Sequence, residues 1–236
     1  NALVLIDEAA ARVAAKESEA RWRNKAPLSV FDGVPTTIKD TTPVRGWPTR
    51  VGSHATDETP AAESAPVVER LQAAGMIVFG KSTTPEFGWK ALTDSPLQGT
   101  TRNPWNLGHT PGGSSGGASA LTAAGINPFN HGNDGGGSIR IPAAACGVVG
   151  FKPPHGRNPD GPPANFDRFN HCGPMTRSVA DAALMQAITS GPHPLDHDSL
   201  RDLPQLGHEV EPACQLCGRD DHDHHVGTIR RFLRHQ

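Results

Sequence analysis

Two glycine- and serine-rich segments lie close together near the middle of the chain, and they constrain its structure more than any other feature. They are Pro111–Gly117 and Asp134–Ser138, and the alanine-rich stretch Ser115–Ala124 between them predicts a short helix. Glycine allows left-handed backbone angles and lets the main chain approach a ligand closely. The two segments therefore predict two loops that present serine hydroxyls and backbone N–H groups at one site.

Helical and strand patterns alternate along most of the chain. Three helical patterns cover Asp7–Lys25, Ser64–Ala74 and Val179–Ser190. The second of these helices is expected to start at the N-cap Ser64 and to end before Gly75. Three short apolar runs predict buried strands over Val34–Ile38, Met76–Phe79 and Val148–Phe151. This alternation is typical of the α/β class, which we predict for the chain.

Charge and cysteine content exclude several kinds of partner. The net charge of −2 indicates neither a nucleic-acid partner nor attraction to a membrane surface. No apolar run approaches the roughly 20 residues that span a bilayer. The four cysteines are too dispersed for a dense disulfide framework, which indicates a reducing compartment. We therefore expect a cytoplasmic protein with no nucleic acid, no membrane and no cofactor.

The second loop contains groups that suit amide hydrolysis. This reaction requires a nucleophile, a proton shuttle and donors for the oxyanion of the tetrahedral intermediate. The loop offers the hydroxyl of Ser138 and the consecutive N–H groups of Gly135–Gly137. Lys39 follows directly after a predicted strand. The residues alone leave two interpretations for this lysine: a solvent-exposed strand end, or a lysine buried in a cleft with a pKa lowered toward neutrality.

Two other kinds of site are open on the residues alone. Gly112–Gly116 matches the G-x-S-x-G nucleophile elbow of α/β-hydrolases and would make Ser114 the nucleophile, although a loop is predicted where the elbow needs a strand. A phosphate-cradling loop is the other alternative, although the P-loop lysine is absent. For His131, a structural role is favoured over that of a general base.

Three motifs, in this order along the chain, resemble those of the amidase signature family. They are Gly33–Pro35 with Ile38–Asp40, Pro111–Gly117 and Gly132–Pro142. The likeness extends from about residue 3 to about residue 200 and includes Gly173–Asp181. It implies the amidase signature fold, a mixed central β-sheet flanked by helices. We expect this fold to be incomplete, because the later half of the family's sequence is missing.

The resemblance implies a Ser–cis-Ser–Lys triad that acts on a small-molecule amide. Lys39 would be the neutral base and Ser138 the acylated nucleophile. Ser114, following a cis peptide bond from Gly113, would bridge them. Because Lys39 must be neutral to accept a proton, activity is expected to rise with pH into the alkaline range.

The resemblance also assigns roles to the residues around the triad. The backbone N–H groups of Gly135, Gly136 and Gly137 would form the oxyanion hole. Three further side chains would brace the loops rather than take part in the chemistry: Ser115, Asp134 and Arg140.

The chain divides into two regions, residues 1–200 and residues 201–236. The first is the expected N-terminal part of an amidase signature domain, and no metal is expected in it. The second is a tail that does not resemble the family. It carries Cys214 and Cys217 at the spacing of a zinc knuckle, followed by histidines at 222, 224 and 225. A zinc site and a foreign segment are both open for this tail.

Three functional hypotheses follow from the resemblance. The first is an amidase that hydrolyses a carboxylic amide to an acid and an amine or ammonia through an acyl-enzyme on Ser138. The second is a catalytically impaired or inactive fragment of such an amidase. The third is a protein similar to the amidase component of a tRNA-dependent amidotransferase. A homodimer is compatible with each of them.

Overall fold

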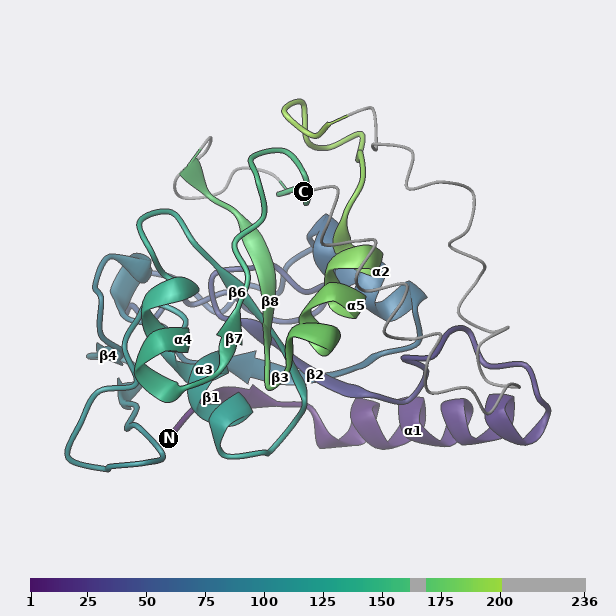
Figure 1. Ribbon diagram of the computed structural model, residues 1–236, viewed down its shortest axis with the longest axis horizontal. Helices are drawn as coiled ribbons and strands as arrows, with labels where there is room; N and C mark the ends of the chain where they lie inside the picture. The colour runs from purple at the N-terminus through teal and green to yellow at the C-terminus, as the bar shows by residue number, and fades with distance from the viewer. Residues whose placement is uncertain (162–168, 201–236) are drawn as a thin grey trace.

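The computed structural model describes residues 1–161 and 169–200. Six strands of this part of the chain form a mixed sheet (Figure 1). Its strands are Leu3–Ile6 (β1), Pro35–Lys39 (β2), Ile77–Ser82 (β3), Phe129–Asn133 (β6), Val149–Gly150 (β7) and Cys172–Thr176 (β8). They pair in the order β1-β3-β2-β6-β8-β7. β2 runs parallel to β3 and β6, whereas β1, β7 and β8 pair antiparallel with their neighbours.

Helices flank this sheet. The α-helices of the described residues are Glu8–Arg23 (α1), Pro66–Ala73 (α2), Gly116–Ala123 (α3), Arg140–Cys146 (α4) and Val179–Thr189 (α5). A short 3₁₀ turn, Glu86–Gly88, and a hairpin of Asp94–Ser95 (β4) and Gly99–Thr100 (β5) lie between β3 and α3. The predicted α/β class and the helices predicted at the positions of α1, α2, α3 and α5 are confirmed. Over the described residues, no helix combines the length and the apolar character that crossing a membrane requires.

The ends of α2 show where local rules hold and where they fail. Gly75 follows the helix with a φ of 86°, a left-handed conformation that favours glycine, as predicted. The prediction for Ser64 is wrong, because Ala65 is the N-cap residue and makes no side-chain capping bond. Ser64 Oγ instead accepts the backbone N–H of Arg45 at 2.9 Å, so its hydroxyl stabilises a neighbouring loop.

The helices cover both faces of the sheet, with α2 and α5 on one side and α3 and α4 on the other (Figure 1). The first pair packs on an apolar cluster that includes Ile38 of β2 and Phe129 of β6. The second pair packs on a smaller cluster that includes Met175 of β8. The sheet is therefore buried on both faces, which is the layered arrangement of α/β proteins.

Alternation along β2 sets the direction of Lys39. Ile38 points into the cluster under α2 and α5, so Thr37 and Lys39 face α3 on the other side. Thr37 donates to Asn130 of β6 on this face, and Asn130 Nδ2 donates to Thr122 of α3 at 2.7 Å. Because β2 and β6 are parallel neighbours, their C-terminal ends lie side by side. Lys39, at the end of β2, therefore lies beside the loop that follows β6.

The sequence patterns did not predict β1, β6 or β8. The runs FNHGN of β6 and CGPMT of β8 contain polar residues, glycine and proline in place of apolar alternation. Of the predicted strand Val148–Phe151, only Val149–Gly150 pairs, and it is half-buried at the edge of the sheet rather than fully buried.

Candidate active site

Lys39, the last residue of β2, contacts Ser114 in the interior of the molecule. Its Nζ donates a hydrogen bond to Ser114 Oγ at 2.7 Å. Lys39 is 0% exposed and Ser114 is 2% exposed. Ser114 follows a cis peptide bond from Gly113, in the loop that leads into α3. The interpretation of Lys39 as a solvent-exposed strand end is therefore wrong, and the structure places the lysine beside the first serine.

Asn133, at the end of β6, is a second partner of Lys39 that sequence reasoning missed. Lys39 Nζ donates to Asn133 Oδ1 at 2.6 Å, and Asn133 Nδ2 donates to Thr41 Oγ1 at 2.6 Å. The amide therefore holds one N–H of the lysine while Thr41 fixes the orientation of the amide. The signal available in the sequence was the position of Asn133, directly before the loop that carries Ser138.

The protonation of Lys39 depends on its burial. Removal from water disfavours the ammonium form and lowers the pKa of Lys39 from 10.5 to about 7. The negative charge of Asp134 acts in the opposite direction and raises this pKa, but its effect is smaller than that of burial. At neutral pH a large fraction of the molecules therefore carries an uncharged amine. An uncharged amine can accept a proton from the hydroxyl that it contacts, whereas an ammonium cannot.

Ser138 lies in the loop between β6 and α4 and lines the same pocket as Ser114. The two loops are joined by the backbone N–H of Ser115, which donates to the carbonyl oxygen of Ser138 at 3.1 Å. Ser115 Oγ also donates to the carbonyl oxygen of Asn133 at 3.1 Å. Among the described residues there is no hydrogen bond between the hydroxyls of Ser114 and Ser138. The two loops are thus linked by Ser115 and not by a bond between Ser114 and Ser138. The bracing role of Ser115 stays a prediction that this geometry supports.

Asp134 organises the loop that carries Ser138. Its buried carboxylate accepts the backbone N–H groups of Gly137 at 2.7 Å and Ile139 at 3.1 Å, and two N–H groups of the Arg140 side chain at 2.9 Å. Burial alone would raise the pKa of Asp134, but the donors, Arg140 first among them, lower it to about 2. A carboxylate with this many donors fixes the backbone around Ser138.

The three glycines of the loop differ in what their N–H groups do. Gly135 and Gly136 line the pocket with Ser138. The Gly137 N–H is occupied by Asp134, so the structure gives it a bracing role in place of the predicted oxyanion role. Gly137 has a φ of 123°, a backbone conformation that other residues rarely adopt, and a Cβ there would lie 2.8 Å from Cδ1 of Ile141. The backbone angle therefore favours glycine at this position. Gly135 and Gly136 remain candidates for the oxyanion hole.

Asp134→Asn tests the brace. The asparagine side chain has the size of the aspartate side chain, but it carries no negative charge, and it places an NH₂ group where N–H donors need an acceptor. We expect the free energy of unfolding to fall by about 2–3 kcal/mol, because hydrogen bonds to a charged group are lost. The reactivity of the Ser138 hydroxyl toward a fluorophosphonate should fall with it, because the loop no longer holds the serine in place. Thermal unfolding and a labelling rate measured on the folded protein separate the two effects, and an unchanged melting temperature would contradict the assignment.

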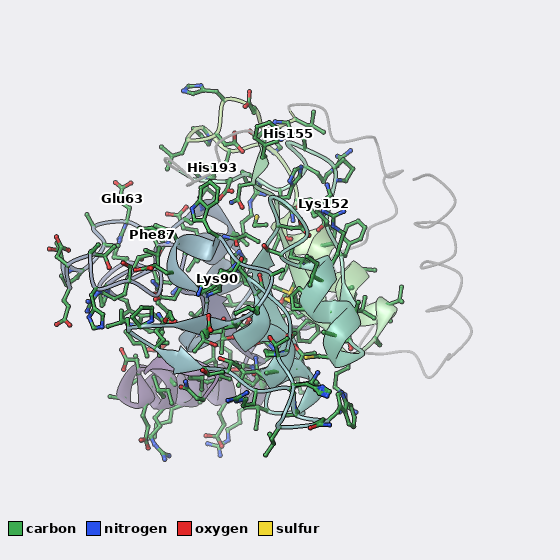
Figure 2. All side chains as sticks on the ribbon, turned by 90° about the vertical axis from the view of Figure 1, so that its left-hand side faces the viewer. Glu63, Phe87, Lys90, Lys152, His155 and His193 are labelled. Carbon is green, nitrogen blue, oxygen red and sulfur yellow. The ribbon has the colours of Figure 1, made fainter. Side chains whose placement is uncertain are left out.

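These groups surround a pocket of about 440 Å³, a volume that suits a small ligand. Thr41 and Thr42 contribute from the segment after β2. Phe87 and Lys90, both labelled in Figure 2, contribute from the segment between β3 and β4. The lining is mixed, with hydroxyl groups, aromatic rings and backbone amides facing one space.

Comparison with known protein families identifies the family of this chain. The family model described as Amidase matches residues 1–233. The chain belongs to the amidase family. The amidase signature resemblance and the fold that it implied are confirmed. The division at residue 200 stays a prediction, because residues 201–236, which carry the proposed zinc ligands, lie outside the described residues.

Relatives of this amidase chain include amide hydrolases and components of amidotransferases. An acylamidase of Rhodococcus erythropolis is 46% identical over 197 residues, which are 83% of this chain and 41% of the relative. The A component of the glutamyl-tRNA(Gln) amidotransferase of Ralstonia pickettii is 40% identical over 222 residues, 93% of this chain and 44% of the relative. The solved structure of a bacterial aryl acylamidase of the amidase signature family has a TM-score of 0.80 and 38% identity, and the match covers 85% of this chain and 42% of that one. The chain thus spans less than half the length of these relatives.

The structure of the amidase chain also bears on the other interpretations of its site. No strand lies between β5 and Ser114 in this fully described segment, so the nucleophile elbow of an α/β-hydrolase lacks its strand. His131 is completely buried, and it shares a face of β6 with Phe129, opposite to the face of Lys39. Burial, with the charge of Lys39, lowers the pKa of His131 to about 3. The imidazole is therefore neutral, and it does not line the pocket.

The described residues were also compared with the ligand sets of metal sites. Over residues 1–161 and 169–200, there is no group of three or more His, Cys, Asp or Glu side chains placed to hold a metal ion. Cys146 and Cys172 are buried free thiols.

Proposed function

We propose that this amidase chain hydrolyses carboxylic amides through an acyl-enzyme on Ser138, with Ser114 as proton relay and Lys39 as base. The hydrogen bond of 2.7 Å from Lys39 Nζ to Ser114 Oγ carries the proposal. A buried lysine whose pKa is near neutrality, in contact with a hydroxyl at the wall of a pocket, is an arrangement that activates a serine nucleophile.

The proposed reaction begins with the attack of Ser138 Oγ on the carbonyl carbon of the amide. The proton of Ser138 passes to Ser114 Oγ, and the proton of Ser114 passes to the uncharged amine of Lys39. The N–H groups of Gly135 and Gly136 stabilise the charge that develops on the carbonyl oxygen.

The C–N bond then breaks as the relay returns a proton to the leaving amine, and Ser138 remains acylated. Water attacks this ester while the relay accepts its proton in the same way. The acid leaves, and a proton returns to Ser138 Oγ. Atoms and charges balance without a metal or a further reactant.

A pH profile tests the base. With a pKa of about 7 for Lys39, kcat/KM for an uncharged amide should rise through pH 7 and level above it. At pH 5 the rate should be about a hundredfold below the plateau, because the neutral fraction falls tenfold for each pH unit. The rate therefore rises at a lower pH than the alkaline range expected from the sequence, because burial lowers the pKa of Lys39. A limb centred near the pKa of a solvent-exposed lysine, or no limb, would contradict the assignment.

Covalent trapping tests the nucleophile. A fluorophosphonate probe should label Ser138, and peptide mapping of the labelled chain identifies the serine. Label on Ser114 would support the elbow alternative, and no label together with no turnover of aliphatic or aryl amides would support the inactive-fragment hypothesis. Lys39→Ala is the matched control, because it removes the base and leaves both hydroxyls.

A second candidate function rests on the amidotransferase relatives. The match to the glutamyl-tRNA(Gln) amidotransferase component of Ralstonia pickettii covers 93% of the chain. In this alternative, the same residues release ammonia from a primary carboxamide such as glutamine for transfer within a larger assembly. Ammonia release from glutamine that exceeds hydrolysis of aryl amides would favour it. We further propose that the protein is cytoplasmic and forms a homodimer.

A further inference from the structure

The proposed catalytic pocket carries a carboxylate that the reaction does not use. Asp160 and Asn170 line the pocket together with Ser114 and Ser138. Asp160 and Lys90 are the charged side chains among the described residues of this lining. Lys90 Nζ is paired with Asp94 Oδ1 at 2.9 Å, so its charge is offset. The charge of Asp160 is the one left to act on a ligand.

The described surroundings of Asp160 hold polar and acidic partners. Asn170 Nδ2 donates to Asp160 Oδ2, and the backbone N–H of Asp160 donates to Asp196 Oδ2 at 2.9 Å. Within the described part of the chain, no lysine, arginine or histidine forms an ion pair with Asp160. The amide of Asn170 orients the carboxylate, and the carboxylate of Asp196 makes the local potential more negative.

The cost of ionising Asp160 in its buried position indicates which kind of ligand it would bind. Burial raises the pKa of Asp160 to about 6, and Asp196 adds to this, in spite of the hydrogen bond from Asn170. At pH 8 the group is therefore ionised but held in an environment that disfavours its charge. A cation placed against it would offset this cost, whereas a carboxylate-bearing ligand would be repelled.

We propose that Asp160 binds a protonated amine of the substrate, so that the pocket selects amides that carry a second, cationic amino group. This inference rests on the proposed function, because it places the amide at Ser138. A charge-assisted hydrogen bond to Asp160 would hold the ammonium end of the substrate in the pocket of Ser114 and Ser138. The substrate class is thus a small amide with an amino group at a distance from the scissile bond.

Matched substrates test the selection at pH 8. One series consists of ω-aminoacyl p-nitroanilides and N-(ω-aminoalkyl) acetamides, and each is paired with a neutral analogue that has a methyl group in place of the ammonium. For the fitting chain length, the cationic member should have a kcat/KM about tenfold to a hundredfold above its neutral analogue, the range of a buried charge-assisted bond. Equal or inverted values at every chain length would overturn the proposal.

Variants of Asp160 assign the preference. Asp160→Asn should lower the cationic-to-neutral ratio at least about tenfold, and Asp160→Glu should restore part of it, because the charge is kept. Asp57→Asn is the matched control, since Asp57 is exposed and does not line the pocket. A ratio that falls equally in the Asp57 control would show a general effect of net charge and would overturn the assignment to Asp160.

A binding measurement separates this inference from the proposed reaction. In the Ser138→Ala chain, calorimetry with the same cationic and neutral amides needs no turnover. The cationic amide should bind about tenfold or more tightly with Asp160 present than with Asp160→Asn. Binding that is equal in both chains refutes the inference even if hydrolysis is observed. If the Ser138→Ala chain shows this binding preference but the chain with Ser138 in place hydrolyses no amide, the proposed function is refuted and the inference stands.

Discussion

Replacement of Ser138 by alanine is expected to lower kcat/KM for amide hydrolysis at least about a thousandfold and to abolish covalent labelling by a fluorophosphonate. The reason is that the acyl-enzyme cannot form without the Ser138 hydroxyl. The pocket, the Lys39–Ser114 hydrogen bond and the N–H groups of Gly135 and Gly136 remain, so ligand binding should survive. Single-turnover hydrolysis and intact-mass analysis of the labelled chain measure the two effects.

Two further variants are compared with Ser138→Ala. Ser190→Ala removes a hydroxyl at the end of α5, outside the pocket, and should retain both activity and label. Ser114→Ala removes the relay but leaves the nucleophile, so slow labelling of Ser138 should persist while turnover falls. Turnover of the Ser138→Ala chain at the rate of the parent would transfer the nucleophile to another residue and end the proposed mechanism.

The parts of the site that local sequence could predict are those that one segment encodes by itself. The apolar run before Lys39 identified β2, and the glycine and serine residues around Gly112 and Ser138 identified two loops that end at helices. The structure adds that Lys39 and Ser114 form a hydrogen bond and that both lie in the interior. Burial could not be inferred from the position of Lys39 at a strand end, which allows an exposed side chain equally well.

The parts that could not be predicted depend on long-range pairing. β6 has a polar sequence, and Asn130 is tolerated in the middle of the sheet because Thr37 and Thr122, from two other elements, satisfy its amide. No local pattern contains this information. Asn133 was missed for the same reason, since its partner Lys39 is brought to it by the parallel pairing of β2 and β6.

The role of Gly137 shows a limit of a different kind. Glycine at this position was interpreted as an oxyanion donor, because it is one of three consecutive glycines next to Ser138. The structure explains the glycine by its positive φ and by the closeness of Ile141, and it pairs the N–H with Asp134. A sequence shows that a glycine is present, but the reason for it depends on the backbone angle and the neighbours.

Asn133→Asp is expected to move the rising limb of the pH profile upward by about one to three pH units, the effect of an opposite charge beside a titrating group. The asparagine oxygen lies 2.6 Å from Lys39 Nζ, so a carboxylate there would pair with the ammonium and stabilise it. At pH 6 the rate should therefore fall about tenfold to a thousandfold. The plateau should be recovered at alkaline pH, because the same base acts once it is deprotonated. Full profiles of kcat/KM, measured with an uncharged amide, give the position of the limb.

The uncharged variant Asn133→Ser separates the charge from the loss of the amide. It removes the acceptor at Lys39 and the donor to Thr41, so the rate should decrease, but the limb should stay near pH 7 because burial still determines the pKa of Lys39. A limb that moves in the serine variant as far as in the aspartate variant would show that packing, and not charge, sets the profile. A limb that stays in place in both variants would mean that the titrating group is not Lys39, and the proton relay through Ser114 would have to be abandoned.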